Sequence, residues 1–247
     1  MIRFIENPNL PQGKIKTVIC GELCDKLNSY LDSIGVQRII IEPNNLIDEA
    51  VKFHADMAAI HLGINKVLLD KNQVSLSEKL LNSNFDVYYS ERSAKEEYPY
   101  DVGLNFALFG NNLMGNFRYA DNKLLELTTE YNRIDVKQGY CKCSCLIVSD
   151  NAVITDDNSI YKALKAYGVY VLLVNKGDIR LDGHDYGFIG GASCKISKEN
   201  ILFFGDVTKH RDYKKIADFI KKHGCEIISL DFPLTDFGGM ITVCEEV

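Results

Sequence analysis

The chain has 247 residues, 46% of them hydrophobic and 25% charged, so it is long and apolar enough to bury the core of one domain. Its formal net charge of -6 gives the surface as a whole little attraction for a polyanion, which argues against nucleic acid as a partner. The first residues lack the apolar stretch of a signal peptide, and no segment approaches the ~20 apolar residues that span a bilayer, so we expect a cytoplasmic protein that does not bind membranes.

Five amphipathic stretches stop at Gly or Asn and pass directly into an apolar strand. Gly and Asn tolerate the left-handed conformation that closes a helix, whereas other side chains clash there. The stops are Gly35 before residues 36–41, Asn84 before 85–89, Asn132 before 133–136, Gly168 before 169–174 and Gly224 before 225–230. The pattern predicts five transitions from helix to strand.

Helical periodicity precedes these stops. Apolar residues form one face over 23–34 and another over 213–220, which predicts two amphipathic helices. The cluster Asp157-Asn158-Ser159 supplies capping side chains for a third helix over 160–167. The two shorter predicted helices are 76–81 and 124–131.

A second element recurs between each strand and the next helix: a polar residue followed by small or apolar residues and a turn. Its copies are 54–60, 101–108, 138–145, 183–192 and 235–243, and the first four lead into a second strand such as 65–69, 112–117 or 201–204. The copies begin 37 to 52 residues apart, which is the spacing of a repeat array.

The fifth copy is divided between the two ends of the chain. Its first strand is C-terminal, and the turn, helix and last strand that it lacks lie over 14–41. Such a division closes a ring without a free sheet edge. We therefore predict an α/β fold, a five-bladed α/β propeller of strand, strand, helix, strand repeats with pseudo-fivefold symmetry, formed by residues 1–247 as a single domain. An ordinary open α/β sheet is the alternative.

Eight cysteines are present, and reduced thiols are expected. Cys141, Cys143 and Cys145 lie too close in sequence to bridge one another, and nothing indicates secretion. On a strand the three would alternate and share one face, which leaves core packing, a zinc site or a redox role open. His54 and Asp56 are also two residues apart on a predicted strand, and His61 is a further candidate ligand if a metal binds there.

This ring of five units resembles the pentein fold of the guanidino-group-modifying enzymes, also called the α/β propeller. The resemblance covers nearly the whole chain. Enzymes of this superfamily include arginine and agmatine deiminases, dimethylarginine hydrolases and amidinotransferases. The resemblance implies attack on a guanidinium carbon by a cysteine near the C-terminus, with a histidine as acid and base and two carboxylates that hold the guanidinium.

Three segments carry the resemblance. Asp101-Val102-Gly103-Leu104-Asn105 is similar to the segment in which the family's Asp binds the guanidinium, and Gly183-His184-Asp185 resembles its His followed by an acid. Residues 238–244 resemble the glycine-rich segment that ends in the nucleophile, although Val243 takes the nucleophile's position by strict count. A one-residue bulge would return Cys244 to it. In the third unit Gln138 stands near the place of the second carboxylate, which is absent.

The resemblance implies His184 and Cys244 as the catalytic residues, with Cys194 as the rival nucleophile. The candidate substrate-binding residues are Asp101, Asp185, Asp236, His54 and Asp56. Neither a metal nor a cofactor is predicted.

Two functions are consistent with these patterns. The first is a divergent hydrolase or amidino-transfer enzyme that acts on a cationic guanidino or amidine small molecule through a cysteine nucleophile. The alternative is a non-catalytic ring that resembles the ribosome anti-association initiation factor of archaea and eukaryotes, which the missing carboxylate and displaced cysteine favour. The sequence leaves open whether the chain is an enzyme, which substrate it takes and whether it forms a homodimer.

Overall fold

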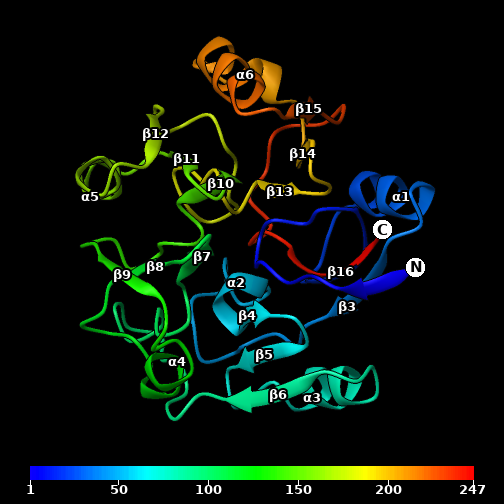
Figure 1. Ribbon diagram of the computed structural model, residues 1–247, viewed down its shortest axis with the longest axis vertical. Coiled ribbons are helices and arrows are strands. Elements are labelled where there is room, and N and C mark those ends of the chain that lie inside the picture. Colours follow the sequence, from blue (N-terminus) through cyan, green and yellow to red (C-terminus); the bar gives the residue numbers. More distant parts are fainter.

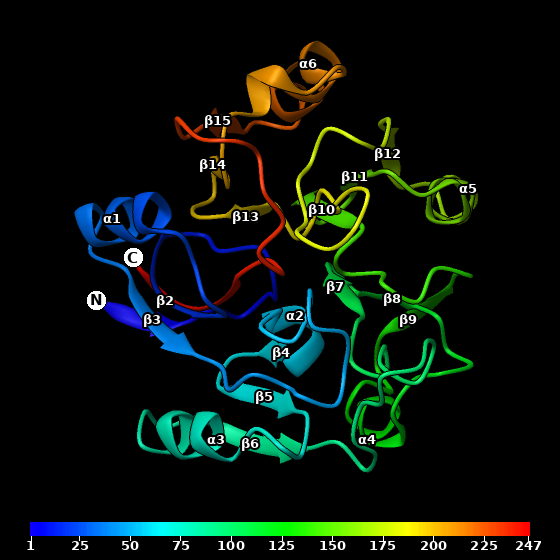
Figure 2. The same ribbon diagram turned by 180° about the vertical axis from the view of Figure 1, so that it is seen from behind.

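The computed structural model describes residues 1–247 and shows a mixed α/β fold of small sheets arranged around a common centre (Figure 1). The α-helices are α1 (Asp25–Ser33), α2 (Ala55–Ala58), α3 (Val74–Leu81), α4 (Asn122–Leu127), α5 (Asn158–Ala166) and α6 (Tyr213–Lys222), with a 3-10 helix η1 (Val207–Lys209). Seen from behind, α1, α3, α4, α5 and α6 again lie at the periphery (Figure 2). None of the helices is long and apolar enough to cross a membrane.

Four of the five sheets have the same three-stranded topology. They are β4 (Ala59–Gly63), β5 (Lys66–Leu69) and β6 (Asp86–Tyr89); β7 (Ala107–Phe109), β8 (Asn112–Gly115) and β9 (Asn132–Asp135); β10 (Cys145–Ser149), β11 (Ala152–Thr155) and β12 (Tyr170–Leu173); and β13 (Ser193–Lys195), β14 (Asn200–Phe203) and β15 (Glu226–Ile228). In each, the first two strands are antiparallel, and the last two are parallel and joined by a crossover that contains one α-helix. The predicted strand, strand, helix, strand unit is confirmed.

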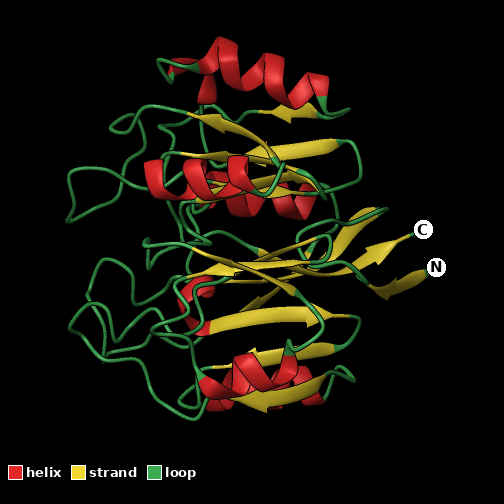
Figure 3. Ribbon diagram, turned by 60° about the vertical axis from the view of Figure 1, so that its left-hand side comes forward, coloured by secondary structure: helices red, strands yellow, loops and turns green.

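The fifth sheet contains both ends of the chain. Its order is β1 (Ile2–Phe4), β16 (Ile241–Glu246), β2 (Lys14–Cys20) and β3 (Gln37–Ile40), and the two termini lie side by side in Figure 3. The prediction that the C-terminal strand shares a sheet with 14–20 and 36–41 is therefore confirmed. The edge strand β1 was not predicted.

Four of the five predicted helix stops are left-handed residues. Gly35, Asn84, Gly168 and Gly224 have φ of 69°, 63°, 75° and 74°. The prediction for Asn132 is wrong, because this residue begins β9 and α4 already ends at Leu127. The N-terminal cap of α5 is confirmed: the Asp157 carboxylate accepts from the backbone N–H groups of Ser159 and Ile160 at 2.7 and 3.0 Å.

Two segments predicted as strands are a short helix and a turn instead. His54 precedes the short helix α2 and Asp56 lies within it, so they do not share a strand face. Residues 139–144 also turn, because the buried Asn105 side-chain oxygen accepts from the backbone N–H groups of Lys142 and Cys143 at 2.8 and 3.3 Å. The three clustered cysteines consequently do not share one face.

The core lies between neighbouring units. Ile154 of β11, for example, packs in one cluster with Phe203 of β14 and Ile216 of α6. Cys141 and Cys145 belong to a second cluster, whereas Cys143 packs with Met57 in a third, nearer the centre. One strand of each sheet lies nearest the centre in Figure 1, and we call these the inner strands: β4, β7, β10, β13 and β16.

Candidate active site

Residues at equivalent places in the five units meet at the centre. The fifth residue before each inner strand is His54, Val102, Tyr140, Phe188 or Asp236. Four of these line a cavity of about 240 Å³, which we call the central pocket, and Val102 packs with Tyr140 beside it. The other lining residues are Asp48, Val51, Cys143, Leu181, His184, Asp185 and Tyr186.

A second set of equivalent residues lies in the layer next to the pocket, which we call its floor, and Cys143 is the one member of the set that lines the pocket itself. The second residue before each inner strand is Met57, Asn105, Cys143, Gly191 or Gly239. The amide nitrogen of Asn105 donates to the backbone oxygen of Asp56 at 3.0 Å and lies 3.1 Å from the Cys143 sulfur. Asn105 therefore ties the first and third units together beneath the pocket.

Cys143, His54 and Asp56 bring a thiol, an imidazole and a carboxyl group together at this floor. One donor atom from each lies within 4.8 Å of the others, and all three residues are buried. Nδ1 of His54 and both carboxylate oxygens of Asp56 are buried without a hydrogen-bond partner. Because buried polar atoms are normally paired, these atoms point to a missing ligand or to a chemical role.

Asp236 is held beside His54 by the backbone. Its carboxylate accepts from the N–H groups of Phe188 and Gly238, both at 2.8 Å, and Oδ1 lies 3.9 Å from Nδ1 of His54. Gly191 leaves the space for this carboxylate, since a Cβ there would come within 1.9 Å of Oδ1. The Asp236 carboxylate, a hydrogen-bond acceptor, thus lies next to the imidazole of His54 in the neighbouring unit.

Burial disfavours charge throughout the floor. It raises the pKa of Asp56 to about 6, against the opposing effect of His54 and Lys142. Burial also raises the pKa of the Cys143 thiol well above its ordinary value, and the carboxylates of Asp56 and Asp236 add to this effect. A cation that enters beside these groups would stabilise both the carboxylates and the thiolate.

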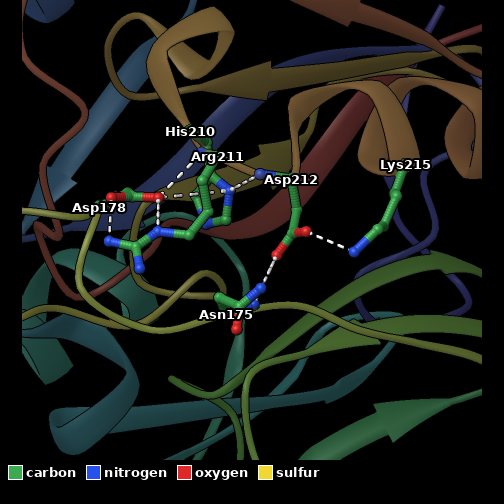
Figure 4. Close-up of polar contacts among 6 residues, drawn as sticks. All are labelled: Asn175, Asp178, His210, Arg211, Asp212 and Lys215. Atoms are coloured by element: carbon green, nitrogen blue, oxygen red, sulfur yellow. Dashed lines mark hydrogen bonds and ion pairs between the residues drawn. The ribbon is translucent and has the colours of Figure 1, made fainter.

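One wall of the central pocket comes from the loop 174–192, which two acids anchor (Figure 4). Asp178 accepts two hydrogen bonds from the Arg211 guanidinium at 2.7 and 2.8 Å, which hold the pKa of Asp178 at about 2. Asp212 accepts from the backbone and side-chain nitrogens of Asn175, both at 2.7 Å. These contacts attach the loop to the segment before α6, and the residues that make them do not line the pocket.

The predicted catalytic residue His184 and the predicted binding residues Asp185 and Asp101 lie at or near this site, but not where the sequence placed them. His184 and Asp185 are exposed at the rim, and Nε2 of His184 lies 3.4 Å from Asp48. Asp101 does not line the central pocket. Its Oδ2 accepts from the Tyr140 hydroxyl at 2.6 Å, and the residue lines a neighbouring cavity of about 770 Å³.

The predicted pairing of Cys244 with His184 is wrong. Cys244 is paired with Phe4 and Thr17 in its sheet and packs in the core, away from the central pocket. The register of β16 is irregular at Cys244, as the prediction required, but this does not bring the thiol to the centre. The rival Cys194 is also a core residue, and burial raises its pKa to about 12.

Sequence reasoning missed Cys143 as the thiol of the site. Cys143 stands two residues before an inner strand, as Asn105 and Gly239 do in their own units. This equivalence can be recognised only when the first residue of each inner strand is known. His61, a candidate ligand, is not part of this group. Its Nε2 lies 2.9 Å from the carbonyl oxygen of Ile64, and burial lowers its pKa to about 4.

Asp156, at the end of β11, is a further buried carboxyl group. It is 5% exposed, and its Oδ1 has no hydrogen-bond partner. Burial raises its pKa to about 7, although Lys176 acts in the opposite direction. The folded state therefore holds this proton more tightly than the unfolded chain, in which the pKa of Asp is about 4. The contribution of Asp156 to stability is therefore fully present below about pH 4 and is lost as the pH rises through about 7.

We expect Asp156→Asn, which keeps the shape of the side chain and cannot ionise, to gain stability relative to the wild type as the pH rises from about 4 to about 8. Urea unfolding of both proteins across this range measures the difference in the free energy of unfolding. A difference that stays constant with pH would contradict the raised pKa.

Solved structures share this architecture at low sequence identity. The inosamine-phosphate amidinotransferase of Streptomyces griseus is 11% identical, with 98% of this chain and 97% of that chain covered and a TM-score of 0.61. The SxtG amidinotransferase of the saxitoxin biosynthetic pathway from Microseira wollei is 12% identical, with 93% and 92% covered and a TM-score of 0.56. The agmatine deiminase of C. jejuni is 14% identical, with 94% and 90% covered and a TM-score of 0.53.

These similarities, together with the repeated unit and its central pocket, define the fold as that of the penteins, the guanidino-group-modifying enzymes. The chain belongs to the family of unknown function DUF6873, whose sequence model matches residues 18–241. No curated protein sequence matches the chain.

Proposed function

We propose that the central pocket hydrolyses, or transfers the amidino group of, a small cationic guanidino or amidine compound, with Cys143 as the nucleophile. The observation that carries this proposal is the convergence of Cys143, His54 and Asp56 within 4.8 Å at the floor of the pocket. The fold supports it, because the similar structures named above include two amidinotransferases and an agmatine deiminase.

The lining of the pocket favours a cation. Asp48, Asp185 and Asp236 line it, and no lysine or arginine does. Phe188 lies 6.1 Å from Tyr140 and 6.0 Å from Tyr186 between ring centroids, so the wall is aromatic. A planar guanidinium can stack on such rings while it donates to a carboxylate.

The proposed reaction has two steps. The Cys143 thiolate attacks the guanidinium carbon, and the departing amine takes a proton from His54 as the amidino-thioether forms. Water, or an acceptor amine in a transfer reaction, then attacks that carbon and gives a proton to His54, and the thiol is released. Asp236 stabilises the protonated imidazole, from which its Oδ1 is 3.9 Å away.

We also infer that the five sheets close one ring and that residues 1–247 form a single domain. The sheet that contains β1, β16, β2 and β3 supports this inference, because it joins the two ends of the chain. The alternative of a non-catalytic ring finds no support among the structures named above, and the cluster of Cys143, His54 and Asp56 favours catalysis.

A panel of small cations tests the function. Agmatine, methylated arginines and alkylguanidines at millimolar concentration should raise the melting temperature, because a ligand that binds the folded state stabilises it. At least one should release ammonia, an amine or a ureido product over time. The matched controls are the alkylurea and the alkylamine of the same length, which lack either the charge or the planar fork. No shift and no product with any guanidino compound would reject the proposal.

A further inference from the structure

We propose that His54, Asp56 and Cys143 also form a zinc site, with the fourth coordination position open to the central pocket. The three side chains come from two units, and each directs one donor atom toward the other two within 4.8 Å. The sequence analysis considered His54 and Asp56 as metal ligands together with His61, and a zinc role for Cys143 together with Cys141 and Cys145, but it did not bring these three side chains together.

The unpaired atoms of the cluster favour a bound cation. Neither oxygen of Asp56 has a hydrogen-bond partner although the residue is 2% exposed, and no lysine or arginine forms a salt bridge with it. Nδ1 of His54 is likewise unpaired. A buried carboxylate without hydrogen-bond partners is costly, and a metal ion satisfies carboxylate, imidazole and thiolate together.

The donor set selects zinc among common metal ions. Thiolate and imidazole are the ligands that zinc prefers, whereas magnesium and calcium require oxygen ligands. Three protein ligands with an open fourth position are typical of zinc sites that hold water or a small molecule.

Only a small movement is needed for coordination. Zinc–ligand bonds of about 2.0 to 2.3 Å place tetrahedral donor atoms about 3.5 Å apart. The donor atoms of the three side chains now lie within 4.8 Å of one another, so they must approach by about 1 Å, which side-chain rotation can provide. Asn105, which lies 3.1 Å from the Cys143 sulfur, keeps that side chain in place beside the site.

Zinc and a guanidino compound would exclude one another, because both need Cys143 and His54. This competition rests on the proposed function, whereas zinc binding itself does not. Zinc would thus act as a reversible inhibitor of the pocket.

The test uses the full chain, freed of metal by a chelator, and cobalt as a spectroscopic probe. One Co²⁺ per chain should bind, with a thiolate charge-transfer band and the intense visible bands of tetrahedral coordination, and one equivalent of Zn²⁺ should displace it. Cys143→Ser should remove the charge-transfer band, and Asp56→Asn should weaken binding at least tenfold. The control is Cys24→Ser, which removes a half-buried thiol and should leave the spectrum unchanged.

Circular dichroism and thermal unfolding establish that each variant is folded, and Asp56→Asn serves if Cys143→Ser does not fold. Retention of the band in Cys143→Ser, or its loss in Cys24→Ser, overturns the zinc site, as does a chain that binds no Co²⁺. If zinc binds and no guanidino compound does, the zinc site stands and the proposed function fails. If a guanidino compound binds and zinc does not, the zinc site is rejected and the proposed function stands.

Discussion

Cys143→Ala should lower the turnover of the guanidino compound identified by the panel about 10³-fold or more, because it removes the only thiol that lines the central pocket. His54 and Asp236 stay in place, so the variant should still bind the compound and show its thermal shift. The measurement is product release together with the shift in melting temperature for the same protein.

Cys244→Ala is the matched control, since Cys244 is also a buried cysteine and lies in the core. Both variants lose a sulfur atom from a packed interior and should lose about 1 to 2 kcal/mol of stability. Only Cys143→Ala should lose activity. Full activity in Cys143→Ala would reject Cys143 as the nucleophile, and a loss confined to Cys244→Ala would return that role to the C-terminal strand.

Gly238→Ala should cost both stability and activity, because Gly238 allows the backbone to pass next to His54. Its φ is 74°, and a Cβ would lie 2.3 Å from Cα and Cβ of His54. We expect a loss of about 3 kcal/mol or more, from the left-handed strain and the clash together. The displaced imidazole should reduce turnover about 10²-fold.

Gly224→Ala separates the two causes. Gly224 also has a φ of 74°, but a Cβ there meets nothing within 4 Å. This variant should therefore lose only the strain of about 1 to 2 kcal/mol and keep its activity. Chemical denaturation gives the two stabilities and product release the two activities. Equal losses of stability, with unchanged turnover in both variants, would show that the contact between residue 238 and His54 affects neither stability nor activity.

Much of the architecture follows from short-range patterns in the sequence. A helix ends where a residue can adopt the left-handed conformation, and Gly35, Asn84, Gly168 and Gly224 do so for reasons that are local to each. The amphipathic face over 213–220 predicts α6 for the same kind of reason, since its period depends only on helix geometry. The prediction that a helix ends at Asn132 is wrong because α4 ends at Leu127, and the residues between it and β9 form a turn although their periodicity is helical.

The chemistry of the site depends instead on how chain segments from different units converge. Sequence spacing suggested that Cys143 shares a strand face with Cys141 and Cys145, but the backbone N–H groups of Lys142 and Cys143 donate to the side-chain oxygen of the distant Asn105, and this holds the segment as a turn. Cys244 lies one residue from the family's position, and its packing against other sheets, which no local pattern specifies, buries it in the core.

By itself, then, the sequence determined the repeated unit, its helix ends and the union of the two termini in one sheet, because local conformation and periodicity encode them. The tertiary structure alone decided that Cys143, His54 and Asp56 meet and that Cys244 and His184 do not. The reason is that a site made by separate units depends on the path of each turn and on the register of each strand, and a shift of one residue in either redirects a side chain from the centre to the core.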